Sequence, residues 1–95
     1  MSERDHQEEP EVRFYDDVPK YRTLVDHFRK LIADGVLVPG DRLPGEPAMA
    51  ARFGIARRTA RRVLDELLES GEAYAVIGLG TYVSDPETGG APKRD

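Results

Sequence analysis

The most constraining feature of this sequence is a glycine that stands between two helical patterns, in the run from Met49 to Leu64. Gly54 separates a short stretch, MAARF, from a second one, ARRTARRVL, that begins at Ala56. Two helices joined by a three- or four-residue turn that contains glycine form a helix-turn-helix unit. The second helix of such a unit is able to enter the major groove of DNA. The run therefore predicts a helix-turn-helix.

Four arginines at the start of the second helix form what we call the basic face: Arg57, Arg58, Arg61 and Arg62. At 100° per residue they occupy one side of the helix, and the apolar residues of 60–67 occupy the opposite side. Arg57/Arg61 and Arg58/Arg62 are like-charge i,i+4 pairs, which cost roughly 0.2–0.5 kcal/mol each on an isolated helix. The positive end of the helix dipole lies there too and favours anions. Because this cluster destabilises the isolated helix, we expect the four arginines to have a role other than stabilising the fold.

Acidic residues further along the same helix offer a structural explanation for part of the basic face. Arg61 with Asp65 and Arg62 with Glu66 have the spacing of i,i+4 salt bridges, although in the less favourable orientation. The other two arginines have no acidic residue three or four positions away on either side. The sequence therefore predicts that the basic face binds an anionic ligand, for which a phosphate backbone is the most natural choice.

The overall formal charge of −4 is unevenly distributed along the 95 residues. Residues 1–17 hold seven acidic and two basic side chains, and residues 85–95 hold three and two. Residues 18–84 hold eight acidic and ten basic side chains, and the stretch from Arg52 to Arg62 has five arginines and no acid. Because the local field steers a polyanion more than the net charge does, the acidic total does not exclude a nucleic-acid partner.

Several classes of protein are excluded by what the sequence lacks. It has no cysteine, which rules out disulfides, thiolate metal sites and cysteine nucleophiles. No apolar run approaches the roughly 20 residues that span a bilayer, and the acidic N-terminus is no signal peptide, so we expect a cytoplasmic protein without membrane contact. Two isolated histidines make no metal site, and His27 is expected to be solvated. We expect no cofactor and no enzymatic activity, since a nucleophile–base pair is missing.

The length suits one small folded domain between two tails. Residues 1–17 are predicted to be a disordered acidic tail, because residues 1–11 have almost no apolar side chains to offset their ordering entropy. Residues 85–95, rich in glycine and proline, are predicted to be a second disordered tail. The folded domain is therefore expected to span residues 18–84.

Glycine and proline divide this domain into a clear order of elements. The first expected element is a helix that is capped by Asp16 or Asp17, has Pro19 in its first turn and ends at Gly35. A connector with a short strand around Arg42-Leu43 follows, and then helices over Pro44–Phe53 and Arg57–Ser70. The last elements are strands over 73–77 and 81–84, joined as a hairpin. The fold class is thus mostly α with a small β-hairpin (α+β). It is a winged helix-turn-helix, with three helices and a wing.

Over residues 18–84 the sequence resembles the DNA-binding domain of GntR-type bacterial transcription regulators. The resemblance rests on three stretches in the right order and spacing: GVLVPGDRLPGE from Gly35, FGIARRTARRVLDEL from Phe53, and GLGTYV from Gly78. These motifs are far more specific than a generic helix-turn-helix. Members of the family usually continue into a separate C-terminal domain that binds a small molecule, so no effector can be inferred from this chain.

The resemblance implies roles for individual residues. Arg57 matches an arginine that reads guanine in the major groove, a contact worth about 1–3 kcal/mol of discrimination. Thr59 and Arg61 match positions that hold phosphates or base edges, Arg58 matches a variable position that tunes sequence preference, and Gly80 matches the point where the wing backbone approaches the minor groove. The expected DNA-contacting residues are Arg52, Arg57, Arg58, Thr59, Arg61, Arg62, Gly80 and Thr81.

The chain departs from the family pattern at several positions. Ala56 and Gly45 stand where the family often has serine or threonine as a helix N-cap, and Pro47 replaces an arginine found in some members. The family wing is often basic, yet residues 73–83 contain no lysine or arginine. We therefore expect weak wing binding, with the affinity concentrated on the helix that begins at Arg57.

Two functions from different classes remain open. The first is a sequence-specific DNA-binding regulator of GntR type, expected to be a repressor that binds a pseudo-palindromic operator of double-stranded DNA as a homodimer, through helix 57–70 and the wing 73–84. The second is a winged-helix protein-interaction module, whose basic face docks on an acidic partner. Arg57, Thr59 and Arg61 favour the first; Ala56 and the uncharged wing keep the second open.

Overall fold

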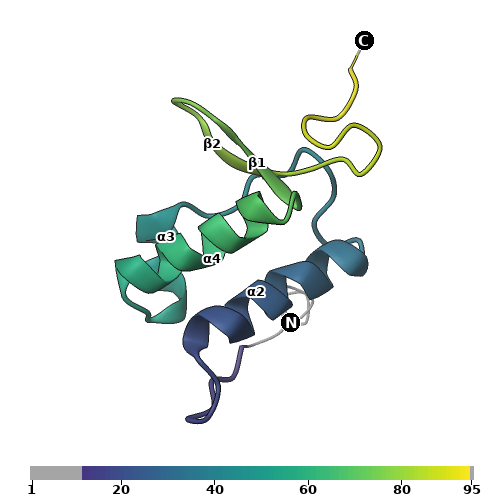
Figure 1. The fold of residues 1–95 in the computed structure, drawn as a ribbon. Helices are drawn as coiled ribbons and strands as arrows, with labels where there is room; N and C mark the ends of the chain where they lie inside the picture. Colours follow the sequence, from purple (N-terminus) through teal and green to yellow (C-terminus); the bar gives the residue numbers. More distant parts are fainter. Residues whose placement is uncertain (1–11, 95) are drawn as a thin grey trace, which may run out of the picture.

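The computed structural model describes residues 12–94, and it confirms the predicted architecture of three helices followed by a β-hairpin. Figure 1 shows the wing rising from the layer of helices. The elements are helices α2 (Lys20–Ala33), α3 (Glu46–Phe53) and α4 (Arg57–Glu69), and strands β1 (Ala73–Val76) and β2 (Gly80–Val83). Each predicted element is present, with ends that differ by up to about two residues.

Helix α2 begins differently from the prediction. Its N-cap is Pro19, and neither Asp16 nor Asp17 caps it. The carbonyl of Pro19 accepts hydrogen bonds from the backbone N–H groups of Arg22 and Thr23, at 3.0 and 3.3 Å. Proline is tolerated at this position because the N–H that it lacks would have had no partner within the helix. The predicted aspartate cap was therefore wrong.

The core lies between α2 and α4 and is closed by α3 and the hairpin. Helix α2 contributes an apolar stripe, and α4 contributes the side opposite the basic face. The fully buried side chains with the largest volume are Phe28, Leu24, Leu43, Met49, Leu67, Val25, Val63 and Val83. Arg29 of α2 donates to both carboxylate oxygens of Glu72 at 2.9 Å, which ties α2 to the turn between α4 and β1.

The hairpin pairs antiparallel, with Tyr74 opposite Tyr82 and their rings stacked at 5.7 Å. The short strand predicted around Arg42-Leu43 is present as a single bridge from Arg42 to Tyr82 on the free edge of β2. The amide of Leu43 donates to the carbonyl of Thr81 at 2.8 Å. The connector therefore lies along the wing, and Arg42 lies beside it.

Residues within both predicted tails make contacts in the structure. The prediction for residues 1–11 lies outside the described residues, but Val12 and Phe14 pack against the core. In the C-terminal segment, Asp85 bridges Gly90, and its carboxylate accepts from the amide of Glu87 at 2.8 Å. Such aspartate turns stabilise loops locally, and this one lies within the segment that was predicted to be a disordered tail. Within residues 12–94, no helix is both long enough and apolar enough to cross a membrane.

Candidate nucleic-acid interface

The turn between α3 and α4 has the helix-turn-helix geometry that the sequence predicted. Gly54 ends α3 in the left-handed conformation, with φ 66° and ψ 41°, and its amide donates to the carbonyl of Ala50. Ile55 then turns into the core, and Ala56 is the extended N-cap of α4. The left-handed conformation at this position favours glycine, because glycine has no Cβ that would clash with the backbone. The turn thus sets the angle at which α4 leaves α3.

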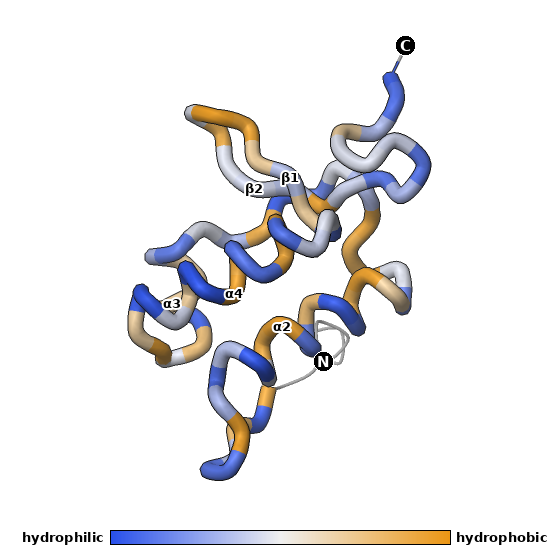
Figure 2. Tube along the Cα trace, viewed as in Figure 1, coloured by the Kyte–Doolittle hydropathy of each residue, from blue (hydrophilic) through white to orange (hydrophobic). Residues whose placement is uncertain are grey.

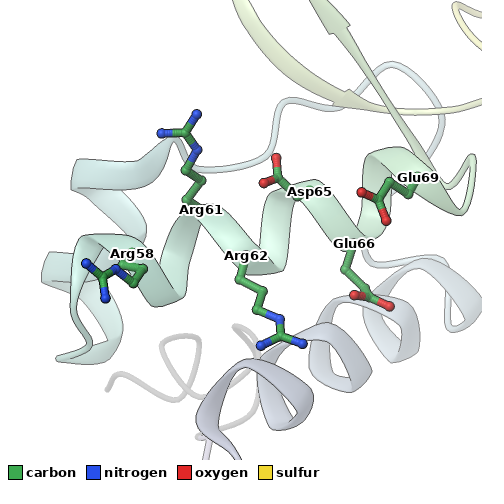
Figure 3. Close-up of a pocket in the computed structure, with 6 residues that line it drawn as sticks. All are labelled: Arg58, Arg61, Arg62, Asp65, Glu66 and Glu69. Atoms are coloured by element: carbon green, nitrogen blue, oxygen red, sulfur yellow. The ribbon is translucent and has the colours of Figure 1, made fainter.

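The basic face lies on the outer side of α4. Its four arginines are all exposed, whereas the opposite side of the helix is buried through Ala60, Val63, Leu64 and Leu67. Figure 3 shows Arg58, Arg61 and Arg62 spaced along the helix, with Arg62 directed toward α2 and Arg61 directed away from it. The predicted segregation of charge and core is confirmed.

The i,i+4 salt bridges that were possible on α4 are not formed among residues 12–94. The acidic neighbour of the basic face comes from α3 instead: the Glu46 carboxylate lies 4.0 Å from Arg57 and 3.9 Å from Arg61. The guanidinium of Arg62 lies 3.8 Å from the ring centre of Tyr21 on α2, in a cation–π contact. Three of the four arginines therefore contact side chains of neighbouring helices.

The other expected contact residues surround the basic face. Arg52 lies in the last turn of α3, with its guanidinium 5.3 Å from the ring centre of Phe53. Thr59 is half-buried in the second position after Arg57 and lines a shallow hollow with Tyr21. Gly80 and Thr81 open strand β2, so they belong to the wing and are separate from α4.

Contacts within the wing account for its glycine. Gly80 has φ +144°, and a Cβ added there would lie 2.8 Å from Nε of Arg42 and 3.2 Å from its terminal nitrogen. The tip of the wing is apolar, as Figure 2 shows, with Ile77 fully exposed and Leu79 60% exposed. Glycine at position 80 is thus favoured by the backbone conformation, and a Cβ there would displace the Arg42 guanidinium.

His27 was expected to be solvated, and this expectation was wrong. Its ring is half-buried and meets the rings of Phe28 and Phe53 edge-on, with centroids 5.2 and 5.8 Å away. Burial disfavours the charged imidazolium and lowers the pKa of His27 below its usual value of 6.5. The histidine thus links α2 to the end of α3.

The sequence profile of bacterial regulatory proteins of the gntR family matches residues 20–83. This chain belongs to the gntR family. It is similar to the mannosyl-D-glycerate transport/metabolism system repressor MngR of Escherichia coli (strain K12), with 43% identity over 67 residues that cover 70% of this chain and 28% of MngR. The HTH-type transcriptional repressor NagR of Bacillus subtilis (strain 168) is 37% identical over 70 residues, which cover 74% and 29% of the two chains.

Solved structures share the fold of this gntR-family chain. A GntR family transcriptional regulator from Listeria monocytogenes superposes with a TM-score of 0.74 and 28% identity, over 80% of this chain and 67% of the other. AraR(DBD), solved in complex with operator ORX1, gives a TM-score of 0.71 and 30% identity over 78% and 95% of the two chains. The chain spans less than a third of the length of MngR and NagR.

The sequence analysis did not foresee that Glu46, Tyr21 and Arg42 contact the expected DNA-binding residues of this gntR-family domain. Arg42 was expected only in a short connector strand. The distance between Tyr21 and Arg62 depends on how α2 crosses α4, and that between Arg42 and Gly80 on which edge of β2 the connector joins. The apolar spacing of α2 is the only signal that places Tyr21 near α4, and no signal in one sequence sets the side-chain path of Arg42.

Proposed function

We propose that this chain binds double-stranded DNA by placing the N-terminal half of α4 in the major groove. The observation that carries the proposal is the basic face, with four exposed arginines at the end of a helix whose opposite side is fully buried. Among the described residues only one carboxylate, that of Glu46, lies within ion-pair distance of them, at 4.0 and 3.9 Å from Arg57 and Arg61. A row of phosphates on both sides of the groove supplies the missing negative charge.

We assign different roles to the arginines according to their position. Arg57 stands at the first position of α4, where residues of a recognition helix reach base edges, and we assign it to guanine. Arg58, Thr59 and Arg61 are assigned to phosphates or base edges beside it. Arg62, directed toward α2, and Arg52, on α3, are assigned to the backbone that flanks the groove.

We further propose that the chain acts as a repressor that occupies an operator as a homodimer in the cytoplasm. MngR and NagR are named repressors, and AraR(DBD) is described in complex with an operator. A single module with ~3–4 phosphate contacts binds weakly and with a steep salt dependence, so specific occupancy requires two copies on one site. Two-fold symmetry of the protein then implies a pseudo-palindromic operator.

Substitution of two arginines tests the assignment of roles. Arg57→Ala is expected to lower affinity for a selected duplex by about 5- to 150-fold, the equivalent of 1–3 kcal/mol, and to change affinity for random duplex little. Arg61→Ala is expected to weaken both duplexes alike and to reduce the salt slope by about 1. Fluorescence anisotropy over a salt series measures both effects.

Lys30→Ala is the matched control for these variants. It removes the same charge from the last turn of α2, where Lys30 pairs with Asp34 at 3.1 Å. It is expected to leave affinity for either duplex unchanged. If Arg57→Ala and Lys30→Ala behave alike, the basic face does not read DNA, and the exposed apolar wing tip would then favour the protein-interaction module.

A further inference from the structure

An arginine from the connector before α3, Arg42, lies against the wing. Residues 73–83 contain no basic side chain, yet the Arg42 guanidinium lies against Gly80 at the start of β2. Three of its atoms, Nε, the terminal nitrogen and the guanidinium carbon, come within 2.8–3.3 Å of the point where a Cβ would stand on Gly80. No other glycine among residues 12–94 is approached so closely by a side chain.

The backbone holds Arg42 in this place. Arg42 bridges Tyr82 across the edge of β2, and its neighbours complete the pairing: the Leu43 amide donates to Thr81, and the Val83 amide donates to Asp41 at 2.9 Å. In an antiparallel pair, side chains two residues apart on one strand share a face with the residue opposite. The side chain of Arg42 therefore runs along the face of β2 that Tyr82 and Gly80 share.

The charge of Arg42 is not used within residues 12–94. Arg42 is exposed and forms no ion pair or side-chain hydrogen bond with any described residue. The adjacent carboxylate, Asp41, accepts instead from the amide of Val38 at 2.9 Å. A positioned arginine without an internal partner is available for an external anion.

Arg42 also faces the helix-turn-helix. It lines one shallow surface groove together with Ala48 and Arg52 of α3 and the residues that precede this helix: Leu43, Pro44 and Gly45. In Figure 1 the wing and the N-terminal end of α4 project to the same side of the molecule. Arg42 thus lies between the wing, at Gly80, and helix α3 of the helix-turn-helix.

We propose that Arg42 is the cation of the wing and binds a phosphate of the DNA backbone between the major groove read by α4 and the minor groove beside the wing. The inference rests on the proposed function and revises the expectation of an uncharged wing. Gly80 then acts indirectly, because the absence of a Cβ leaves the space in which the guanidinium lies. Gly80 and Arg42 form one binding unit.

The test compares Arg42→Gln, Arg42→Lys and the control Lys30→Gln in the whole 95-residue chain, with anisotropy on a selected and a random duplex over a salt series. Arg42→Gln is expected to weaken both duplexes about tenfold and to reduce the salt slope by about 0.9, the value for one lost phosphate contact. Arg42→Lys keeps the charge and retains the slope. Lys30→Gln changes neither quantity.

A second variant separates binding from folding. Gly80→Ala is expected to displace the guanidinium and to weaken binding as Arg42→Gln does, and the double variant to be no weaker than either single one. Thermal unfolding of each variant reports whether the fold persists, and Gly80→Ala carries the test if Arg42→Gln does not fold.

The outcomes distinguish this inference from the proposed function. If Arg42→Gln, folded, keeps the affinity and salt slope of the unaltered chain while Arg57→Ala loses specific binding, Arg42 has no DNA role and the proposed function stands. If Arg42→Lys loses as much of the slope as Arg42→Gln, the phosphate contact is also overturned. If the unaltered chain binds no duplex at any salt, both proposals fail.

Discussion

Glu46 shows how one acidic side chain serves a basic surface. Its carboxylate is about one-third exposed and lies near Arg57 and Arg61, which are 67% and 70% exposed. Ion pairs at such distances and exposure contribute about 0–1 kcal/mol, so they do little for stability. Between two arginines, however, the carboxylate limits where each guanidinium points. We infer that Glu46 positions Arg57 and Arg61 until phosphates replace it.

His27 gives the domain a defined response to pH. Burial between Phe28 and Phe53 lowers its pKa in the folded state, whereas the unfolded chain keeps a value near 6.5. The unfolded state therefore takes up a proton first as the pH falls, and stability is lost below about pH 6.5. Above that pH both states hold a neutral imidazole, and the contribution to stability is constant.

Replacement of His27 by leucine is expected to flatten this dependence. Between about pH 7 and pH 5.5, the urea midpoint of the unaltered chain should fall, and that of His27→Leu should fall less, because the group that takes up the proton is gone. Arg22→Leu, on the exposed side of the same helix, is the control and should keep the slope. Equal slopes for all three chains would contradict the burial of His27.

Among the elements, α4 is the helix that begins with alanine in place of a side-chain cap. Ala56 is its N-cap, with extended backbone and no side-chain hydrogen bond to the first turn. Serine at this position accepts a hydrogen bond from an otherwise unpaired amide and is worth about 0.5–2 kcal/mol over alanine. Ala56→Ser is therefore expected to raise the melting temperature by several degrees, at about 4–8 °C per kcal/mol.

The N-cap of α3 provides the matched comparison for this substitution. Gly45 occupies the equivalent position with no side-chain hydrogen bond. Glycine is only a few tenths of a kcal/mol worse than serine as an N-cap, so Gly45→Ser should change the melting temperature much less. A melting temperature that is unchanged or lowered by Ala56→Ser would contradict the capping geometry at the start of α4.

Local signals were sufficient to predict the elements from the sequence. Gly35, Gly54 and Gly71 all have positive φ, and each ends a helix where the sequence predicted an end. The start of α2 was misassigned because Asp16 and Asp17 are good caps in isolation, whereas Pro19 is the N-cap in the structure. Propensity alone does not contain that information.

The candidate site was predictable only where it lies on one helix. The basic face follows from the 3.6-residue period of an α-helix, so its segregation from the core could be derived from the order of residues in α4 alone. The contacts of Glu46, Tyr21 and Arg42 join residues that are distant in sequence, and they depend on helix crossing and strand pairing. A single sequence contains no distance between such residues.

Across the whole molecule, charge is separated between the domain and its ends. Residues 1–17 hold seven acidic and two basic side chains, whereas every charged residue from Arg52 to Arg62 is basic. Local potential governs encounter with a polyanion, so a net charge of −4 is compatible with DNA binding. The chain corresponds to less than a third of MngR or NagR. For specific occupancy, we expect that two copies of it bind one operator.

Sequence reading by this domain is tested by selection of bound duplexes from a random DNA library, at about 0.15 M salt. We predict enrichment of a two-fold symmetric motif with a guanine in each half-site, and loss of the preference for that guanine when the Arg57→Ala variant is used. A single half-site would support base reading and contradict the dimer. No enrichment, with binding only in the ~10⁻⁴–10⁻⁶ M range of non-specific complexes, would contradict the claim that this domain reads DNA sequence.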